Sequence, residues 1–162
     1  MKKLCAVFLC IGIIFSFAAC KKDTPTDKKA IFEHVNLEYN FQIPTGFECV
    51  VDNNDKQTVW MYNKDGDPAD WQIIITLTPA KAEEFTSFDL NQRALIKSQT
   101  AKTLTDGRFL YEYDTNENFA DIYSIAEYDK TAECIIFLQA KDSVSQEITT
   151  ELFDKASVTK TK

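Results

Sequence analysis

Alternating apolar and polar residues predict the first strand of the fold. Between residues 35 and 43 every second position is apolar and the positions between are polar, a period of two that is typical of a strand with one buried face. The turn Pro44-Thr45-Gly46 ends this strand, and Phe47 to Val51 continues as a second one. The apolar positions of the first strand are Val35, Leu37, Tyr39, Phe41 and Ile43.

Five further strands are predicted from apolar runs that turn-forming residues separate. They are Thr58 to Tyr62, Trp71 to Thr78, Arg108 to Asp114, Phe119 to Tyr128 and Ala132 to Ala140. Residues 115–118 are expected to join two of them as a hairpin. The strands that begin at Thr58, Trp71 and Ala132 leave neither face polar. These three are therefore expected to be central strands, covered on both faces.

A first helix is predicted from Ser87 to Thr103. Thr86 and Asp89 have the spacing of a capping box, which would start the helix, and Asp106-Gly107 would stop it. The apolar residues that recur at helical spacing, and so are expected to face the core, are Leu90, Ala94, Leu95 and Ala101.

A second helix is predicted close to the C-terminus. Ser143 and Gln146 have the same capping-box spacing, and an apolar stripe follows them. We expect this helix to lie across the sheet. The stripe consists of Ile148, Leu152, Phe153 and Ala156.

These elements predict one α+β domain over residues 35–162. Short turns between most strands imply a largely antiparallel sheet of about six to seven strands, with two main helices. Strands that are apolar on both faces need a layer on each side, which favours an α-β-α sandwich.

The N-terminus has the pattern of a signal peptide. Lys2 and Lys3 precede an apolar run from Leu4 to Phe17, and 14 residues are fewer than the roughly 20 that span a bilayer as a helix. Phe17-Ala18-Ala19-Cys20 resembles the bacterial lipobox, which implies a lipid on Cys20 and cleavage after residue 19. The alternatives are an ordinary secretory peptide with an incidental cysteine, and a transmembrane helix.

A lipidated Cys20 would anchor the chain to a lipid bilayer of the bacterial cell envelope, with the domain in the periplasm or at the cell surface. Residues 20–34 are polar, rich in Lys, Thr and Asp, and are predicted to form a flexible tether. Loss of Lys2 and Lys3 with the leader would change the formal charge from −7 to −9, because every acidic residue follows the cleavage site. An acidic domain repels phosphates, so nucleic-acid binding is not expected.

Cys49 and Cys134 are the two cysteines of the folded part. An oxidising envelope would permit a disulfide between them. Both lie in apolar strand patterns, so two buried free thiols are an equal alternative.

The chain has few of the residues that catalysis requires. His34 is the single histidine and is expected at the surface, and no nucleophile elbow is present. We therefore expect a non-enzymatic protein without a cofactor. The acidic turn with Asp65, Asp67 and Asp70 is a weak metal-site candidate, for which the alternative is a solvated loop.

Aromatic residues offer a further candidate site. Several fall on neighbouring predicted strands and would form a docking surface for a protein or glycan if they emerged on one exposed face; otherwise they form core. Tyr62 and Tyr113 are the candidates for exposure, because each lies near a strand end. The full set is Trp60, Tyr62, Trp71, Phe109, Tyr111, Tyr113, Tyr123 and Tyr128.

A family resemblance rests on five features of the sequence. Tyr39 to Phe47 is similar to the opening strand, Pro-x-Gly-aromatic turn and second strand of the PsbP/Mog1-like fold, particularly of its small bacterial lipoproteins and DcrB-like proteins. Four other features are also similar: the strand that ends in Thr78-Pro79, the helix from Ser87 to Thr103, the turn Thr105-Asp106-Gly107-Arg108, and the C-terminal strand with its helix. The resemblance implies a non-enzymatic protein that docks on or chaperones a larger one, and it transfers no functional residue.

Together these features predict a lipoprotein that is anchored to a membrane of the cell envelope. Its expected role is that of a non-catalytic module that binds an envelope protein or assists its assembly in a chaperone-like way. The alternative is a solute- or ion-binding lipoprotein with a pocket between sheet and helix.

Overall fold

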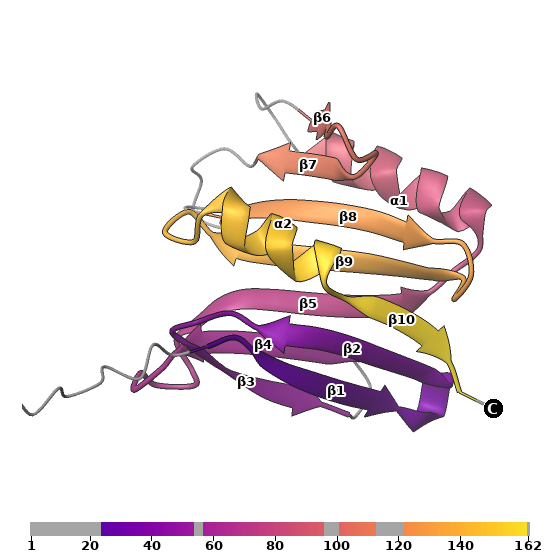
Figure 1. Cartoon of the computed structure of the whole chain (residues 1–162). Helices are drawn as coiled ribbons and strands as arrows, with labels where there is room; N and C mark the ends of the chain where they lie inside the picture. Colours follow the sequence, from indigo (N-terminus) through magenta and orange to yellow (C-terminus); the bar gives the residue numbers. More distant parts are fainter. Residues whose placement is uncertain (1–23, 54–56, 96–100, 113–121, 162) are drawn as a thin grey trace, which may run out of the picture.

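The computed structural model describes residues 24–53, 57–95, 101–112 and 122–161. These residues form two antiparallel sheets and two α-helices (Figure 1). The predicted α+β class, with a seven-stranded sheet and two helices, is confirmed. The predicted hairpin link at residues 115–118 lies outside the described ranges.

The larger sheet has seven strands in the order β3-β4-β5-β9-β8-β7-β6. Its central strands β5 and β9 are the apolar runs that begin at Trp71 and Ala132, and both were expected in the centre. The strands are β3 (Phe47–Asp52), β4 (Thr58–Asn63), β5 (Trp71–Pro79), β6 (Ala101–Thr103), β7 (Phe109–Glu112), β8 (Ile122–Asp129) and β9 (Cys134–Lys141).

The smaller sheet has the order β1-β2-β10 and contains β1 (Thr26–Phe32), β2 (Leu37–Ile43) and β10 (Ser157–Lys160). A 3-10 turn, η1 (Glu33–Val35), joins β1 to β2. Strand β2 is the alternating segment of the sequence, but it belongs to this second sheet. Strand β10 was not predicted.

Strand β1 corrects the predicted tether at residues 20–34. Residues 26–32 pair along their whole length with β2, and Ala30 and Phe32 are buried. The prediction failed because the strand begins with four exposed, mainly polar residues, which are typical of a linker. Only its second half carries the inward apolar side chains.

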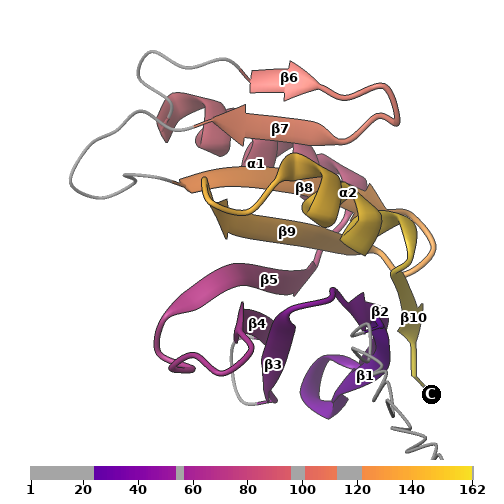
Figure 2. The same ribbon diagram turned by 60° about the vertical axis from the view of Figure 1, so that its left-hand side comes forward.

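The main core lies between the two sheets. Tyr39 and Phe41 of β2 stack at 5.0 Å between ring centroids and belong to the same buried cluster as Ile73 and Ile75 of β5. Figure 2 shows the small sheet and α2 on one face of the large sheet and α1 on the other. One outer layer is therefore a helix, and the other combines a helix with a sheet.

Helix α1 (Ala82–Leu95) begins before the predicted start. Thr86 and Asp89 lie inside it, so they are not its cap; instead, the Glu84 carboxylate accepts a hydrogen bond from the backbone N–H of Lys81 at 2.6 Å. The predicted buried side is also wrong, because Leu90 and Leu95 are 62% and 48% exposed. The helix is rotated about its axis relative to the predicted one, so that a different set of side chains faces the sheet.

The inward face of α1 carries Phe85, Phe88 and Asp89, spaced three and four residues apart. The Tyr111 hydroxyl of β7 donates a 2.6 Å hydrogen bond to Asp89, whose other oxygen pairs with Arg93. Residues 101–103, predicted as helix, form β6.

Helix α2 (Gln146–Asp154) lies across the sheet as predicted (Figure 1). Its N-cap is Ser145, whose hydroxyl accepts from the Ile148 N–H; Ser143 instead contacts Gln72 at 3.3 Å. The predicted cap is therefore two residues too early. The buried positions are Thr149, Leu152 and Phe153.

Candidate functional site

The outer face of the large sheet is divided into two halves. Over β6 to β9, α1 covers it with Phe85 and Phe88. Phe85 lies 5.7 Å from the rings of both Phe109 and Tyr128, and Phe88 lies 5.1 Å from Phe137. This half is a second, smaller core.

Over β3 to β5 neither α1 nor α2 lies on this outer face (Figures 1 and 2). The register places five half-buried apolar side chains here, because residues that pair across strands lie on the same face. Val50 pairs with Trp60, Trp60 pairs with Ile74, and Tyr62 pairs with Trp71. The prediction that β4 is covered on both faces is therefore wrong for the described residues. We call Val50, Trp60, Tyr62, Trp71 and Ile74 the aromatic face.

Polar contacts hold the rim of the aromatic face. The Tyr62 hydroxyl donates a 2.9 Å hydrogen bond to Glu48, and this bond raises the pKa of Tyr62. On the opposite side, across the strands, the Lys141 ammonium of β9 lies 5.6 Å from the Trp71 ring centroid and pairs with Asp70. Two rings are thus held in place by side chains of opposite charge.

The other predicted aromatic residues have different positions. Tyr111 and Tyr123 are buried, and Phe109 and Tyr128 lie under α1. Tyr113 and the predicted lipidation site Cys20 lie outside the described residues. Trp60 and Trp71 were in the predicted aromatic set, but only Tyr62 and Tyr113 were expected to be exposed. The shared face of Trp60, Tyr62 and Trp71 could not be predicted, because it depends on strand order and on the register shift at Met61/Tyr62.

Cys49 and Cys134 do not form a disulfide, which was one of the two predicted alternatives; both are free thiols. Three strand spacings of about 4.8 Å and a six-residue offset along β9 separate them, which places them on the order of 20 Å apart. A disulfide needs about 4.4–6.8 Å between Cα atoms. The alternative of two free thiols is correct, with Cys134 buried and Cys49 partly exposed.

The acidic turn is held by one contact within the turn and one to β9. Asp65 adopts a left-handed conformation, Asp67 accepts a 2.8 Å hydrogen bond from the Ala69 N–H, and Asp70 pairs with Lys141. Within the described ranges no three potential ligands converge on one point. These carboxylates are therefore placed as loop-stabilising groups.

The single histidine lies at the surface. His34 is exposed in η1, where its ring contacts the side chain of Gln57. This exposure agrees with the prediction.

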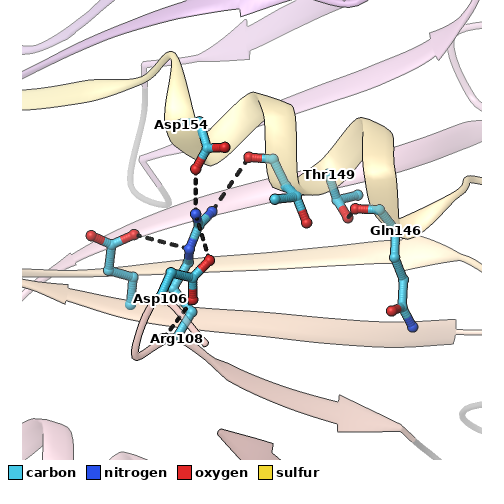
Figure 3. Close-up of polar contacts among 7 residues, drawn as sticks. Asp106, Arg108, Gln146, Thr149 and Asp154 are labelled. Atoms are coloured by element: carbon cyan, nitrogen blue, oxygen red, sulfur yellow. Dashed lines mark hydrogen bonds and ion pairs between the residues drawn. The ribbon is translucent and has the colours of Figure 1, made fainter. Parts of the chain in front are cut away.

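The most enclosed cation that the structure describes is Arg108, which sequence analysis did not select. The residue lies directly before β7 and is 7% exposed. Figure 3 shows its guanidinium between Asp106 and Asp154 and below α2. The Asp106 pair measures 2.8 Å, and the backbone carbonyl of Thr150 accepts a 3.4 Å hydrogen bond. Glu127 lies 3.9 Å away.

This arrangement fastens α2 to the sheet. The carbonyl of Thr150 lies in the middle of α2, and Asp154 is the last residue of the helix, where a cation is favoured by the helix dipole. Each of the three guanidinium nitrogens of Arg108 has a protein oxygen within 4 Å. The Arg108 centre is thus a structural link rather than a ligand site.

Two open cavities lie near the start of β1. One of about 340 Å³ separates β1 from β3 and is lined by Thr26, Lys28, Phe47 and Cys49, among others. The other, of about 200 Å³, is more apolar and lies between α2 and the end of β2, lined by Pro25, Pro44, Ile148 and Leu152, among others.

Comparison with known proteins gives no relative for this chain: no family model, curated protein or solved structure matches it. None of the helices in the described ranges has the length and apolar character needed to cross a membrane.

Proposed function

We propose that this chain is a lipid-anchored envelope protein whose domain binds another protein through the aromatic face. The observation that carries the proposal is the clustering of Trp60, Tyr62 and Trp71 on the half of the sheet that α1 leaves open. Tryptophan and tyrosine are enriched among the residues that dominate binding energy in protein interfaces. Val50 and Ile74 complete an apolar centre, as a protein partner requires.

The short distance along the chain from the proposed anchor supports a membrane-proximal role. Five residues separate Cys20 from Thr26, the first residue of β1. Fully extended, such a segment reaches about 20 Å. A domain on this anchor would meet partners at or within the membrane surface.

The docking proposal is tested by formaldehyde crosslinking in bacterial cells that produce the full-length protein. We expect a defined crosslinked partner with the natural protein and with Leu90→Ala, and its loss with Trp60→Ala. Leu90 is a matched control, because it is a large, exposed apolar residue on α1. Equal crosslinking by Trp60→Ala and the natural protein would refute docking through this face.

The anchor is tested separately by labelling cells with palmitate. Incorporation should be lost in Cys20→Ala, because the thiol sulfur would carry the lipid. Label that survives this substitution would exclude lipidation at Cys20.

A second candidate function, binding of a small apolar solute, is favoured by the 200 Å³ cavity beside Ile148 and Leu152. A fatty acid or similar compound that binds there should raise the melting temperature saturably. Ile148→Asp should abolish this rise.

A further inference from the structure

Strand β3 is an open edge of the large sheet. Within the described ranges it pairs with β4 and with no other strand. Its sequence, Phe-Glu-Cys-Val-Val-Asp, contains neither proline nor lysine, the residues that most often prevent an edge strand from pairing with another chain.

The register shows which backbone groups of β3 face away from the sheet. The Lys64 N–H donates to the Gly46 carbonyl at 2.8 Å, so residues 46 and 64 form a hydrogen-bonded pair. Hydrogen-bonded pairs alternate along an antiparallel ladder. Residues 48, 50 and 52 therefore direct their N–H and C=O groups toward β4, whereas Cys49 and Val51 present theirs at the free edge. Phe47 presents only its C=O there, because its N–H donates to the Pro44 carbonyl at 3.2 Å.

Space for an additional strand exists beside this edge. The 340 Å³ cleft separates the edge of β1, at Thr26 and Lys28, from Phe47 and Cys49 of β3. Side chains of an added strand that point inward would enter this cleft. Those that point outward would extend the aromatic face beyond Val50.

Charge defines the partner that fits. Glu48 and Asp52 lie on the outer side of β3, with Val50 between them. Like charges opposite each other destabilise a strand pair, and opposite charges stabilise it. Antiparallel pairing of two β3 strands about Val50 would place Glu48 against Asp52, which disfavours a second copy of this chain. A partner strand that has an apolar residue opposite Val50, and a basic residue two positions away on each side, would place opposite charges beside Glu48 and Asp52.

We propose that β3 accepts an extended segment of a partner protein, by strand addition, with the pattern basic-x-apolar-x-basic on its outward side. This inference rests on the proposed function and specifies how the partner binds. Backbone hydrogen bonds to Cys49, Val51 and the carbonyl of Phe47 would supply affinity, and Glu48 and Asp52 would select the basic residues.

The test uses full-length protein in detergent micelles and a fluorescein-labelled heptapeptide, Thr-Lys-Thr-Val-Thr-Lys-Thr. We expect saturable fluorescence anisotropy and slower hydrogen–deuterium exchange in residues 47–52. A peptide with N-methyl groups on the amides that would face β3 keeps its charge but loses these donors, and should bind at least tenfold more weakly. Equal binding of the two peptides, slowed exchange elsewhere only, or no saturable binding would overturn the inference.

Protein variants give an independent test. The double variant Glu48→Lys, Asp52→Lys should bind the lysine peptide at least tenfold more weakly and gain affinity for a version with glutamates. Cys49→Pro removes an N–H from the free edge without removing a bond to β4, and should also abolish binding. The N-methylated peptide decides the question if Cys49→Pro does not fold.

The two proposals can fail separately. If crosslinking to a partner requires Trp60 but the peptide does not bind and Cys49→Pro still crosslinks, docking on the aromatic face stands and strand addition is wrong. If crosslinking is independent of Trp60, the proposed function itself fails.

Discussion

The guanidinium of Arg108 lies over the ring of Phe153, with its central carbon 4.9 Å from the ring centroid. Phe153 belongs to the buried stripe of α2, and Arg108 directly precedes β7. One cation thus contacts an aromatic ring from α2 and carboxylates from three separate segments. The position of α2 depends on this contact as well as on apolar packing.

Replacement of Arg108 by methionine should therefore destabilise the domain. The variant keeps an apolar contact with Phe153 but leaves Asp106, Glu127 and Asp154 without their common counter-ion. We expect a loss of about 2 kcal/mol in the free energy of unfolding, less than for a fully enclosed pair because the carboxylates remain in contact with water. Urea unfolding measures it. Lys155→Met, which removes an exposed pair with Glu151, should cost no more than about 0.5 kcal/mol.

Glu127 should make stability depend on pH. Burial raises the pKa of Glu127 above its ordinary value of 4.5, and Arg108 opposes this rise. Because the folded state holds the proton more tightly than the unfolded state, ionised Glu127 is destabilising, and this cost grows as the pH rises through the folded pKa. Glu127→Gln should thus be more stable than the natural protein at neutral pH, and the difference should vanish at acidic pH.

Glu133 provides a control of opposite sign. Its hydrogen bond with Lys160 lowers the pKa of Glu133, so ionised Glu133 is stabilising above 4.5 and this stabilisation is lost as the pH falls through the folded pKa. Glu133→Gln should be less stable than the natural protein at neutral pH only. Urea unfolding over the pH range 3 to 8 compares the two variants, and parallel pH profiles would contradict both assignments.

Adjacent isoleucines on β5 test whether the aromatic face is open. Ile75 is 1% exposed and faces the main core, whereas Ile74 lies on the outer side. Ile75→Ala should cost about 2–5 kcal/mol because it leaves an enclosed cavity, whereas Ile74→Ala should cost about 1 kcal/mol because water can replace the lost side chain. Equal losses of unfolding free energy would show that the outer side is covered.

A similar pair on β1 tests whether this segment is part of the fold. Phe32 is fully buried and Ile31 is 42% exposed. Phe32→Ala should cost about 3–5 kcal/mol, and Ile31→Ala about 0.5 kcal/mol. If residues 26–32 were a tether, neither substitution would lower the melting temperature.

The two free thiols should differ in reactivity. Burial raises the pKa of Cys134 to about 12 and also raises the pKa of Cys49, which is partly exposed. Because the thiolate is the reactive form, we expect iodoacetamide to modify Cys49 slowly and Cys134 only after unfolding, as measured by peptide mass mapping. A Cys49–Cys134 linked peptide without reductant would contradict the structure.

The local sequence patterns predicted several elements correctly for a physical reason. Alternation over residues 37–43 requires one dry and one wet face, and β2 has them. The run Cys134 to Leu138 requires a position between other strands, and β9 has that position. In such segments the apolar spacing determines the conformation, because only one period buries all the apolar side chains.

Other elements depended on their partners. Strand β1 is polar over its first half and becomes a strand through pairing with β2, and β10 pairs with the other edge of β2. The register of α1 depends on the contact of Asp89 with Tyr111, a residue 22 positions away. Capping signals are short and recur by chance, so they indicated two starts that tertiary packing did not use.

The sequence by itself determined the α+β class, the central strands β5 and β9 and the acidic character of the chain, because these follow from composition and from apolar periodicity over a few residues. Only the tertiary structure decided that Trp60, Tyr62 and Trp71 share an open face and that Cys49 and Cys134 lie far apart. It also decided that Arg108 links β7 to α2. Each of these depends on strand order and register, which result from the simultaneous burial of apolar surface from distant segments and are not encoded in any one of them.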